Sequence, residues 1–417
     1  MATSTSTSDA ASGEGGRLSP DLKIWVLCLW TVLFVLYFQF TLDFRLTSES
    51  SMRWIHLIIP MMVVLTLGDL RLVRASPPVI YLGTAALSLL VAYSRFGLNF
   101  AGQRFLVAAM TYYVGCALSR RIPLDVMLRE LRRFFTVYVI LVAIQCIAFF
   151  AIYDRFNLYG IPSVNQGTFI DGGVNAQGNW IALTAPYFLG HGFWAISIAV
   201  FLLSLIYSSR STFILWALAT LLAVLMKSGR IKLRRVIIWI PVLVALGAGL
   251  VALLVSSGVP LFSRFSSCDT GGASDSCMGR ILFDIGGVIL IQRNLWGYGI
   301  GNVMPRLYDL WSGHPLAQVN HIHNLLLELT LDYGIISVAA YGFMVFSAIR
   351  IHWRTQRCPE FFFALLGAWF IGVLSGHNGL EVNFWFLCGL FFTYAGLEKP
   401  LHGIRREARG ALSFAET

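Results

Sequence analysis

The chain of 417 residues is far too apolar for a soluble globular protein, because hydrophobic residues make up 57% of it and charged residues only 12%. Soluble domains carry roughly 25% charged residues. The formal net charge of +10 is explained by basic residues retained on one side of a membrane, where they attract anionic lipid headgroups. Nucleic-acid binding is therefore not needed, and the composition predicts an all-α polytopic membrane protein.

The predicted organisation is a single transmembrane domain between two tails. Residues 1–22 are rich in Ser, Thr, Ala and Gly and lack the apolar core of a signal peptide, which predicts a disordered cytoplasmic tail. The transmembrane domain occupies 23–398, and 399–417 form a second cytoplasmic tail. Apolar runs of roughly bilayer length indicate about twelve spans. We expect them near 24–42, 54–68, 79–93, 104–118, 134–153, 175–190, 193–208, 212–226, 236–256, 325–349, 359–376 and 383–397.

Basic residues predict which connections face the cytoplasm. The two tails and four alternate connections hold 21 of the 31 Lys and Arg residues, and basic residues are retained on the cytoplasmic side. Both termini are thus predicted to be cytoplasmic. The basic residues of these connections are Arg71, Arg74, Arg120, Arg121, Arg129, Arg132, Arg133, Lys227, Arg230, Lys232, Arg234, Arg235, Arg350, Arg354 and Arg357.

One sizeable outer loop is expected at about 257–323. Cys268 and Cys277 lie in it, and an oxidising periplasm favours a short turn closed by a disulfide with a structural role, the alternative being two free thiols. The apolar stretch 281–292 predicts a helix on the membrane surface. A glycine-rich turn, 296–301, follows it.

Three polar sites are predicted on this outer side. Arg210 follows the seventh span, Arg280 lies in the outer loop, and His321 and His323 immediately precede the tenth span. Two guanidiniums can bind phosphate oxygens and stabilise a diphosphate leaving group. A histidine can take the proton from an attacking hydroxyl. The pattern favours group transfer from a pyrophosphate-linked donor, without a cofactor. The sequence has no Asp-x-Asp motif and no cluster with metal-ligand spacing, which predicts metal-independent chemistry.

Each of these residues also has a plainer interpretation. An arginine at the end of a span is commonly a snorkelling anchor, and His321 could serve only to cap the helix. Glu328 and Asp332 follow Asn324 at helical i, i+4 spacing and form a polar stripe that enters the membrane. Such carboxylates either orient the histidine or bind an acceptor, or they pair with an arginine on a neighbouring span.

Together these residues resemble the bacterial O-antigen ligase and polymerase superfamily, over roughly 173–396. The resemblance rests on three segments: Ser209-Arg210-Ser211, Gly279-Arg280 with 294–299, and 321–328 with Gly334-Ile335 downstream. Members have about twelve spans and a GT-C-type architecture. They transfer a glycan from undecaprenyl diphosphate to an acceptor sugar hydroxyl at the periplasmic face of the inner membrane, without a metal.

The resemblance implies roles for individual residues. His323, directly before Asn324, would be the base that activates the acceptor, and Arg210 and Arg280 would bind the donor diphosphate. His321, Asn324 and Glu328 are candidates for substrate binding. Asn175 is a further candidate because relatives often have an asparagine-rich start to a span there, although this chain lacks the usual Asn-Pro-Asn pattern.

The residues leave several functions open. A ligase places a finished glycan on lipid A-core, whereas a polymerase joins lipid-linked repeat units, and both need the same base and diphosphate site. The single moderate outer loop favours the ligase. A protein O-glycosyltransferase is a remoter relative. A transporter of lipid-linked glycans would require pseudo-symmetric halves and ionisable residues near the bilayer midplane, and a structural scaffold would leave the arginines and the histidine exchangeable.

Overall fold

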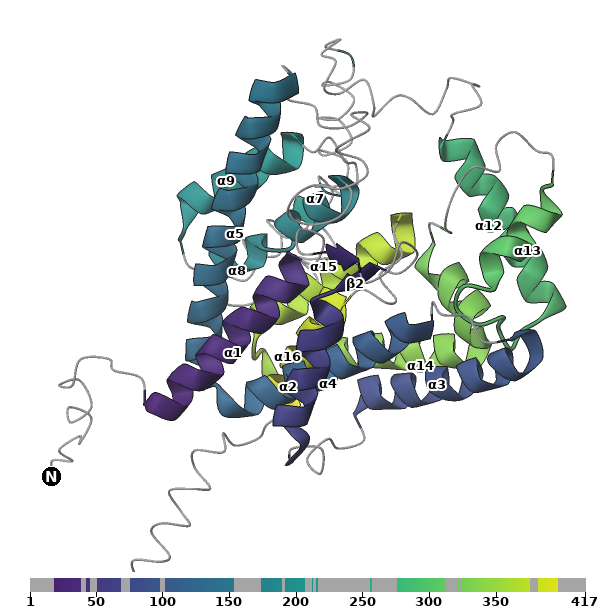
Figure 1. Cartoon of the computed structure of the whole chain (residues 1–417), viewed down its shortest axis with the longest axis horizontal. Helices are drawn as coiled ribbons and strands as arrows, with labels where there is room; N and C mark the ends of the chain where they lie inside the picture. The colour runs from purple at the N-terminus through teal and green to yellow at the C-terminus, as the bar shows by residue number, and fades with distance from the viewer. Residues whose placement is uncertain are drawn as a thin grey trace, which may run out of the picture.

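The computed structural model of the chain is a helical assembly, shown in Figure 1. It describes residues 19–38, 43–45, 51–68, 76–97, 102–153, 174–189, 192–206, 276–312, 324–375 and 382–396, and in addition 212, 215, 216, 256 and 322. The elements are α1 Pro20–Tyr37, β1 Asp43–Arg45, β2 Ser51–Arg53, α2 Ile55–Leu65, α3 Pro77–Phe96, α4 Gln103–Arg121, α5 Leu124–Tyr153, α7 Val174–Ala182, α8 Ala185–Leu189, α9 Trp194–Ile206, α12 Ser276–Arg293, α13 Val303–Leu310, α14 Leu325–Thr355, α15 Pro359–Ser375 and α16 Val382–Gly396.

The helices confirm a helical membrane protein, and four of them meet the length and hydropathy that a span requires. These are α1, α3, α5 and α14. Shorter apolar helices lie at 55–65, 194–204, 359–369 and 382–396. Ten of the twelve predicted spans have helical counterparts among the described residues, the sixth divided into α7 and α8, while those at 212–226 and 236–256 lie almost entirely outside them.

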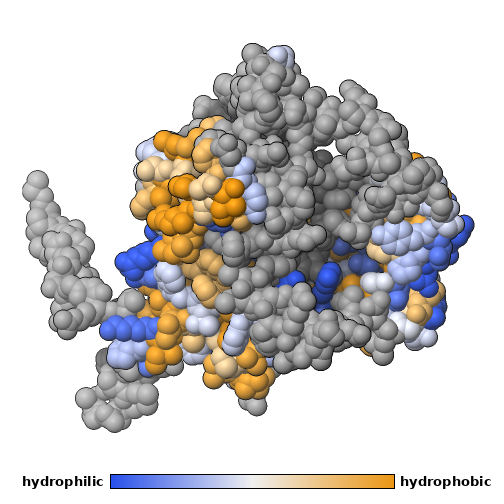
Figure 2. All heavy atoms as spheres, turned by 45° about the horizontal axis from the view of Figure 1, so that its top comes forward, coloured by the Kyte–Doolittle hydropathy of each residue, from blue (hydrophilic) through white to orange (hydrophobic). Residues whose placement is uncertain are grey.

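The outward faces of these helices are apolar, as the bilayer requires. Leu27, Leu90 and Ile147 are each about two-thirds exposed, an arrangement that a soluble protein avoids over large areas. In Figure 2 apolar side chains cover the side formed by α5 and α9, whereas hydrophilic ones gather over α12 and α13. This distribution of apolar and hydrophilic side chains is the one expected of a protein that contacts lipid on one part of its surface and water on another.

The interior is dense in aromatic side chains. Tyr81 of α3 stacks on Trp385 of α16, with ring centroids 5.4 Å apart, and Tyr37 of α1 packs edge-on against Phe134, Phe135 and Tyr138 of α5. Large rings bury much area for little lost rotamer freedom. They join helices that are distant in sequence into one core.

Helix α5 begins ten residues before the predicted start of its span at 134. Arg129, Arg132 and Arg133, expected in a connection, lie within the helix, and the connection from α4 is only 122–123. The cause is a buried face at helical spacing, formed by Met127, Glu130, Leu131 and Phe134 among others. Hydropathy did not predict this buried face, because the charged residue Glu130 is part of it.

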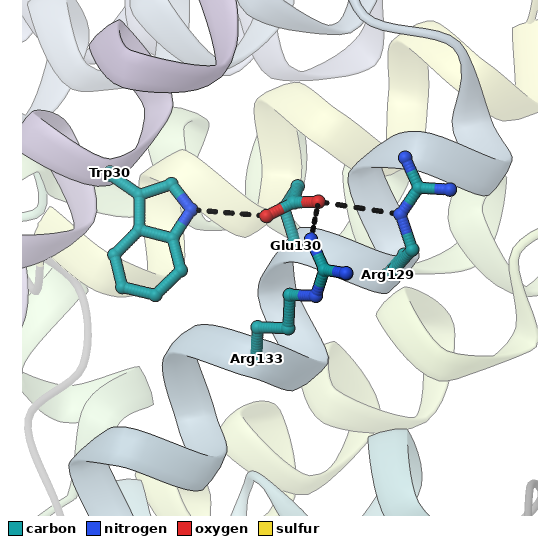
Figure 3. A network of polar contacts seen from close by, with 4 residues as sticks. All are labelled: Trp30, Arg129, Glu130 and Arg133. Atoms are coloured by element: carbon teal, nitrogen blue, oxygen red, sulfur yellow. Dashed lines mark hydrogen bonds and ion pairs between the residues drawn. The ribbon is translucent and has the colours of Figure 1, made fainter. Parts of the chain in front are cut away.

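Glu130 is 3% exposed and joins α1 to α5 through hydrogen bonds, as Figure 3 shows. Its carboxylate accepts from Trp30 Nε1 at 3.3 Å, Arg133 at 2.8 Å and Arg129 at 3.3 Å. A buried carboxylate is tolerated only when it is paired and hydrogen-bonded. Here two arginines satisfy that condition and leave an excess positive charge at this end of the helix.

Two short strands interrupt the helical pattern and were not predicted. β1 and β2 pair antiparallel, with Phe44 opposite Met52. They lie between α1 and α2, in a connection predicted to be on the outer side.

Helices α4 and α16 pack closely because each has a glycine at the contact. A Cβ added to Gly115 would lie 2.6 Å from the carbonyl oxygen of Phe386, and one added to Gly389 would lie 2.9 Å from the nitrogen of Cys116. Small residues allow membrane helices to approach to backbone contact.

Replacing Gly389 with alanine is expected to lower the thermal stability of the purified protein, because the added methyl group overpacks this contact at a cost of about 1–3 kcal/mol. The control is Gly83→Ala, since a Cβ at Gly83 meets nothing within 4 Å. A thermal unfolding measurement in detergent checks both. Equal melting temperatures for the two variants would contradict the packing argument.

Candidate outer-loop site

The start of α14 is fixed on both sides of residue 323. Asn324 is the N-cap, and its side-chain oxygen accepts hydrogen bonds from the nitrogens of Leu326 at 3.0 Å and Leu327 at 3.2 Å. Ile322 is buried and packs with Leu331 and residues of α12 and α13. The chain on either side of residue 323 is therefore held by a helix cap at Asn324 and by the buried side chain of Ile322.

The glycine-rich turn docks into a break in α14. Gly334 has φ 78° and ψ 169°, which is not helical. Around it the nitrogens of Tyr298 and Gly299 donate to the carbonyl oxygens of Leu331, at 2.6 Å, and Asp332, at 3.1 Å, while the nitrogen of Ile335 donates to Leu295 at 3.0 Å. The turn thus supplies hydrogen bonds that the helix loses at its break.

Glycine is required on both sides of this contact. A Cβ on Gly297 would lie 2.6 Å from the nitrogen of Gly334, and a Cβ on Gly334 would lie 2.6 Å from the carbonyl oxygen of Trp296. Both residues also have positive φ, where a side chain is strained. Asn294 completes the turn, because its amide donates to the carbonyl oxygen of Gly297 at 2.7 Å.

A small apolar cluster joins α12 and α13 to α14. Phe283 and Leu290 of α12, Leu307 of α13, Ile322 and Leu331 are all buried in it. Gly287 makes room for the contact, since a Cβ there would meet Leu331 at 3.3 Å and Ile322 at 3.9 Å. Helix α12 therefore lies directly against the segment that leads into α14.

Tyr298 connects this cluster to the end of α3. Its hydroxyl donates to the carbonyl oxygen of Leu290 at 3.0 Å, and its ring packs on Phe96 with centroids 5.1 Å apart. The Arg306 guanidinium lies over both rings, 4.6 Å from Phe96 and 5.1 Å from Tyr298. Burial raises the pKa of the Tyr298 phenol, which keeps it protonated as a donor.

The described residues include only part of the predicted site. Asn324 and Glu328 lie at the start of α14, with Glu328 half-buried. Residues 280 and 277 lie in α12 and residue 175 in α7, but the side chains of Arg280, Cys277 and Asn175 are outside the described part. Arg210, Cys268, His321 and His323 lie wholly outside it.

Sequence reasoning found the glycine-rich turn but missed its partner. The spacing of Gly297, Gly299 and Gly301, all with positive φ, indicates a turn, and nothing in it points to Gly334. Sequence reasoning also missed Tyr93 of α3, whose ring would lie 2.9 Å from a Cβ on Gly299 of the turn. Within the described residues no group of three or more His, Cys, Asp or Glu side chains could hold a metal ion.

Residues 191–342 match the O-antigen ligase family. The match covers just over a third of the chain and is narrower than the resemblance expected over 173–396. No curated protein matches the chain significantly.

The family stretch contains most of the predicted site. It spans the positions of Arg210, Arg280, His323 and Asn324 and extends through the break at Gly334. Asn175 lies outside it. The family supports an O-antigen ligase or polymerase type of activity, and thus a membrane glycosyltransferase-like enzyme acting on lipid-linked glycans.

Gly334→Ala is expected to disrupt the docked turn, because alanine would be strained at this φ, by about 1–3 kcal/mol, and would collide with Trp296. Lower accumulation in membranes or lower thermal stability is the expected result. The matched control is Gly342→Ala in the same helix, where a Cβ meets nothing within 4 Å and alanine is the better helix former. If both variants accumulate and melt alike, the docking does not stabilise the protein.

Proposed function

We propose that this protein is an O-antigen ligase-type glycosyltransferase of the bacterial inner membrane, with both termini in the cytoplasm and its site at the periplasmic face. It moves a glycan from undecaprenyl diphosphate to a sugar hydroxyl of lipid A-core. The observation that carries the proposal is that the O-antigen ligase stretch, 191–342, includes the positions of Arg210, Arg280 and His323.

In the proposed reaction His323 takes the proton of the acceptor hydroxyl as its oxygen attacks the anomeric carbon. The bond from that carbon to the diphosphate oxygen breaks, and its electron pair leaves with undecaprenyl diphosphate. Arg210 and Arg280 bind the diphosphate and stabilise the charge that develops there. No metal ion or cofactor takes part.

The packing of the outer loop supports a shared site for Arg280 and His323. Phe283, one helical turn after residue 280, and Ile322, directly before residue 323, belong to the same buried cluster. The helix N-terminus that follows Asn324 adds a partial positive charge. An anionic diphosphate is favoured beside such a helix start.

A polymerase that joins lipid-linked repeat units is the second candidate, because the family covers both reactions and the chemistry is shared. A transporter of lipid-linked glycans is a remoter candidate. Deletion of the gene distinguishes the ligase from the polymerase. Loss of a ligase leaves long polymer on the carrier with unmodified lipid A-core, and loss of a polymerase leaves single repeat units. An unchanged carrier pool would contradict a transferase of either kind.

His323→Ala, expressed in the deletion strain, is expected to lower transfer by about a hundredfold or more, because a general base contributes on this scale. Arg280→Lys is expected to rescue poorly, because a point charge lacks the bidentate fork of the guanidinium. The measurements are the carrier-linked glycan pool and the surface polysaccharide, with membrane abundance as the control. Full activity of His323→Ala would remove the assigned base.

Transfer in isolated membranes is expected to continue after treatment with EDTA, because the proposed arginines take the place of a divalent ion. The assay is the initial rate of transfer before and after chelation. Loss of activity that added Mg²⁺ restores would contradict the metal-independent mechanism.

A further inference from the structure

Three polar side chains meet where the glycine-rich turn docks, and each comes from a different helix. Tyr93 lies near the end of α3, Arg104 is the second residue of α4, and Asp332 lies in α14 just before its break. Directly after the turn, the amide of Asn302 donates to the carbonyl oxygen of Gly97 at the end of α3, at 3.3 Å.

Asp332 is 8% exposed, and in the described structure its carboxylate has no hydrogen bond or ion pair. Its main-chain oxygen, by contrast, accepts from Gly299. An unpaired carboxylate in an apolar helix is costly, and such residues in membrane segments are commonly functional. The contrast with Glu130, which three donors satisfy, makes the unpaired state of Asp332 distinctive.

The side chains that follow Arg104 and Asp332 in their helices, Phe105 and Tyr333, pack with ring centroids 6.0 Å apart. Arg104 therefore lies near Asp332 but does not pair with it. Its charge acts favourably on that carboxylate, but among the described residues no ion pair of 4.0 Å or less involves Arg104. The Arg104 side chain is exposed, so its donors are available to a ligand. Two opposite charges thus lie near one another without an ion pair between them.

Tyr93 adds a buried hydroxyl with no hydrogen-bond partner in the described structure. Its ring lies against Gly299, where a Cβ would be 2.9 Å from the ring, and its hydroxyl lies against Gly102, where a Cβ would be 2.5 Å away. The Asp332 charge also acts on it. Buried polar groups in native proteins nearly always have partners, so this hydroxyl is a candidate for contact with a ligand.

We propose that Tyr93, Arg104 and Asp332 form a subsite that binds the hydroxyl groups of a neutral sugar unit in the substrate glycan. This rests on the proposed function. A carboxylate accepts from sugar hydroxyls, a guanidinium donates to hydroxyl or ring oxygens, and a phenol does either. The combined charge of Arg104 and Asp332 is zero, and a diphosphate would be repelled by Asp332, so the subsite is distinct from the proposed diphosphate site.

The subsite lies at a useful distance from the proposed chemistry. At 1.5 Å per residue, Asp332 is about 10 Å along α14 from its first residue, the spacing of one or two sugar units rather than of the reacting bond. The sugar could belong to the donor or to the acceptor. Saturation with each substrate in turn separates these sources.

The test uses membranes from a deletion strain that expresses the full chain as wild type, Arg104→Ala, Asp332→Asn or Tyr93→Phe. The donor is the carrier-linked glycan that the deletion strain accumulates, and the acceptor is its unmodified lipid A-core, or the carrier-linked repeat unit if that accumulates. The variants are expected to raise the KM for one substrate by about tenfold, the scale of one lost charged hydrogen bond, with little change in kcat. The substrate affected is the one whose sugar occupies the subsite.

The matched control is Arg95→Ala, an exposed arginine at the end of α3, which should keep both KM values. Wild-type KM values in Arg104→Ala and Asp332→Asn, with His323→Ala inactive, would overturn the subsite and leave the proposed function standing. Unchanged transfer in the deletion strain would overturn the function itself. If Asp332→Asn fails to accumulate, the exposed Arg104→Ala decides the question.

Discussion

The main-chain contact between the glycine-rich turn and α14 is the constraint on which the outer part of the molecule depends. Inside a bilayer a helix cannot break unless other groups satisfy the hydrogen bonds it loses. Here the loop does so with three backbone bonds around Gly334. The same contact determines where α12, the end of α3 and the start of α14 lie, so one local break organises three separate segments.

The rest of the molecule follows the lipid as its solvent. Long apolar faces lie outward on α3, α5 and α14, and a charged side chain in the interior requires partners. Glu130 shows this rule near the start of α5, because two arginines and the indole of Trp30 surround it. Asp332 departs from this rule. It lies beside the glycine-rich turn, where its main-chain oxygen accepts from Gly299.

Hydropathy alone predicted most helices, because burial in lipid is a property of a continuous run of residues. It misplaced the start of α5, since Glu130 and its arginines appear as a loop in sequence although they line a helix. The pattern before Asn324 predicted a helix start, and the cap confirms it. The docking of Gly297 on Gly334 could not be predicted, because it depends on two backbones that meet across 37 positions of sequence.

The division between matched and unmatched sequence has a physical basis. Donor binding and base chemistry require fixed residue types, and the residues that we propose for them, Arg210, Arg280 and His323, all lie in the matched stretch at 191–342. Lipid-facing helices require only apolar surface, which many sequences provide. Tyr93 and Arg104 come from this second part and lie beside Asp332 of the first. The proposed subsite would let glycan specificity change through α3 and α4 while the proposed reacting groups in the matched stretch stay the same.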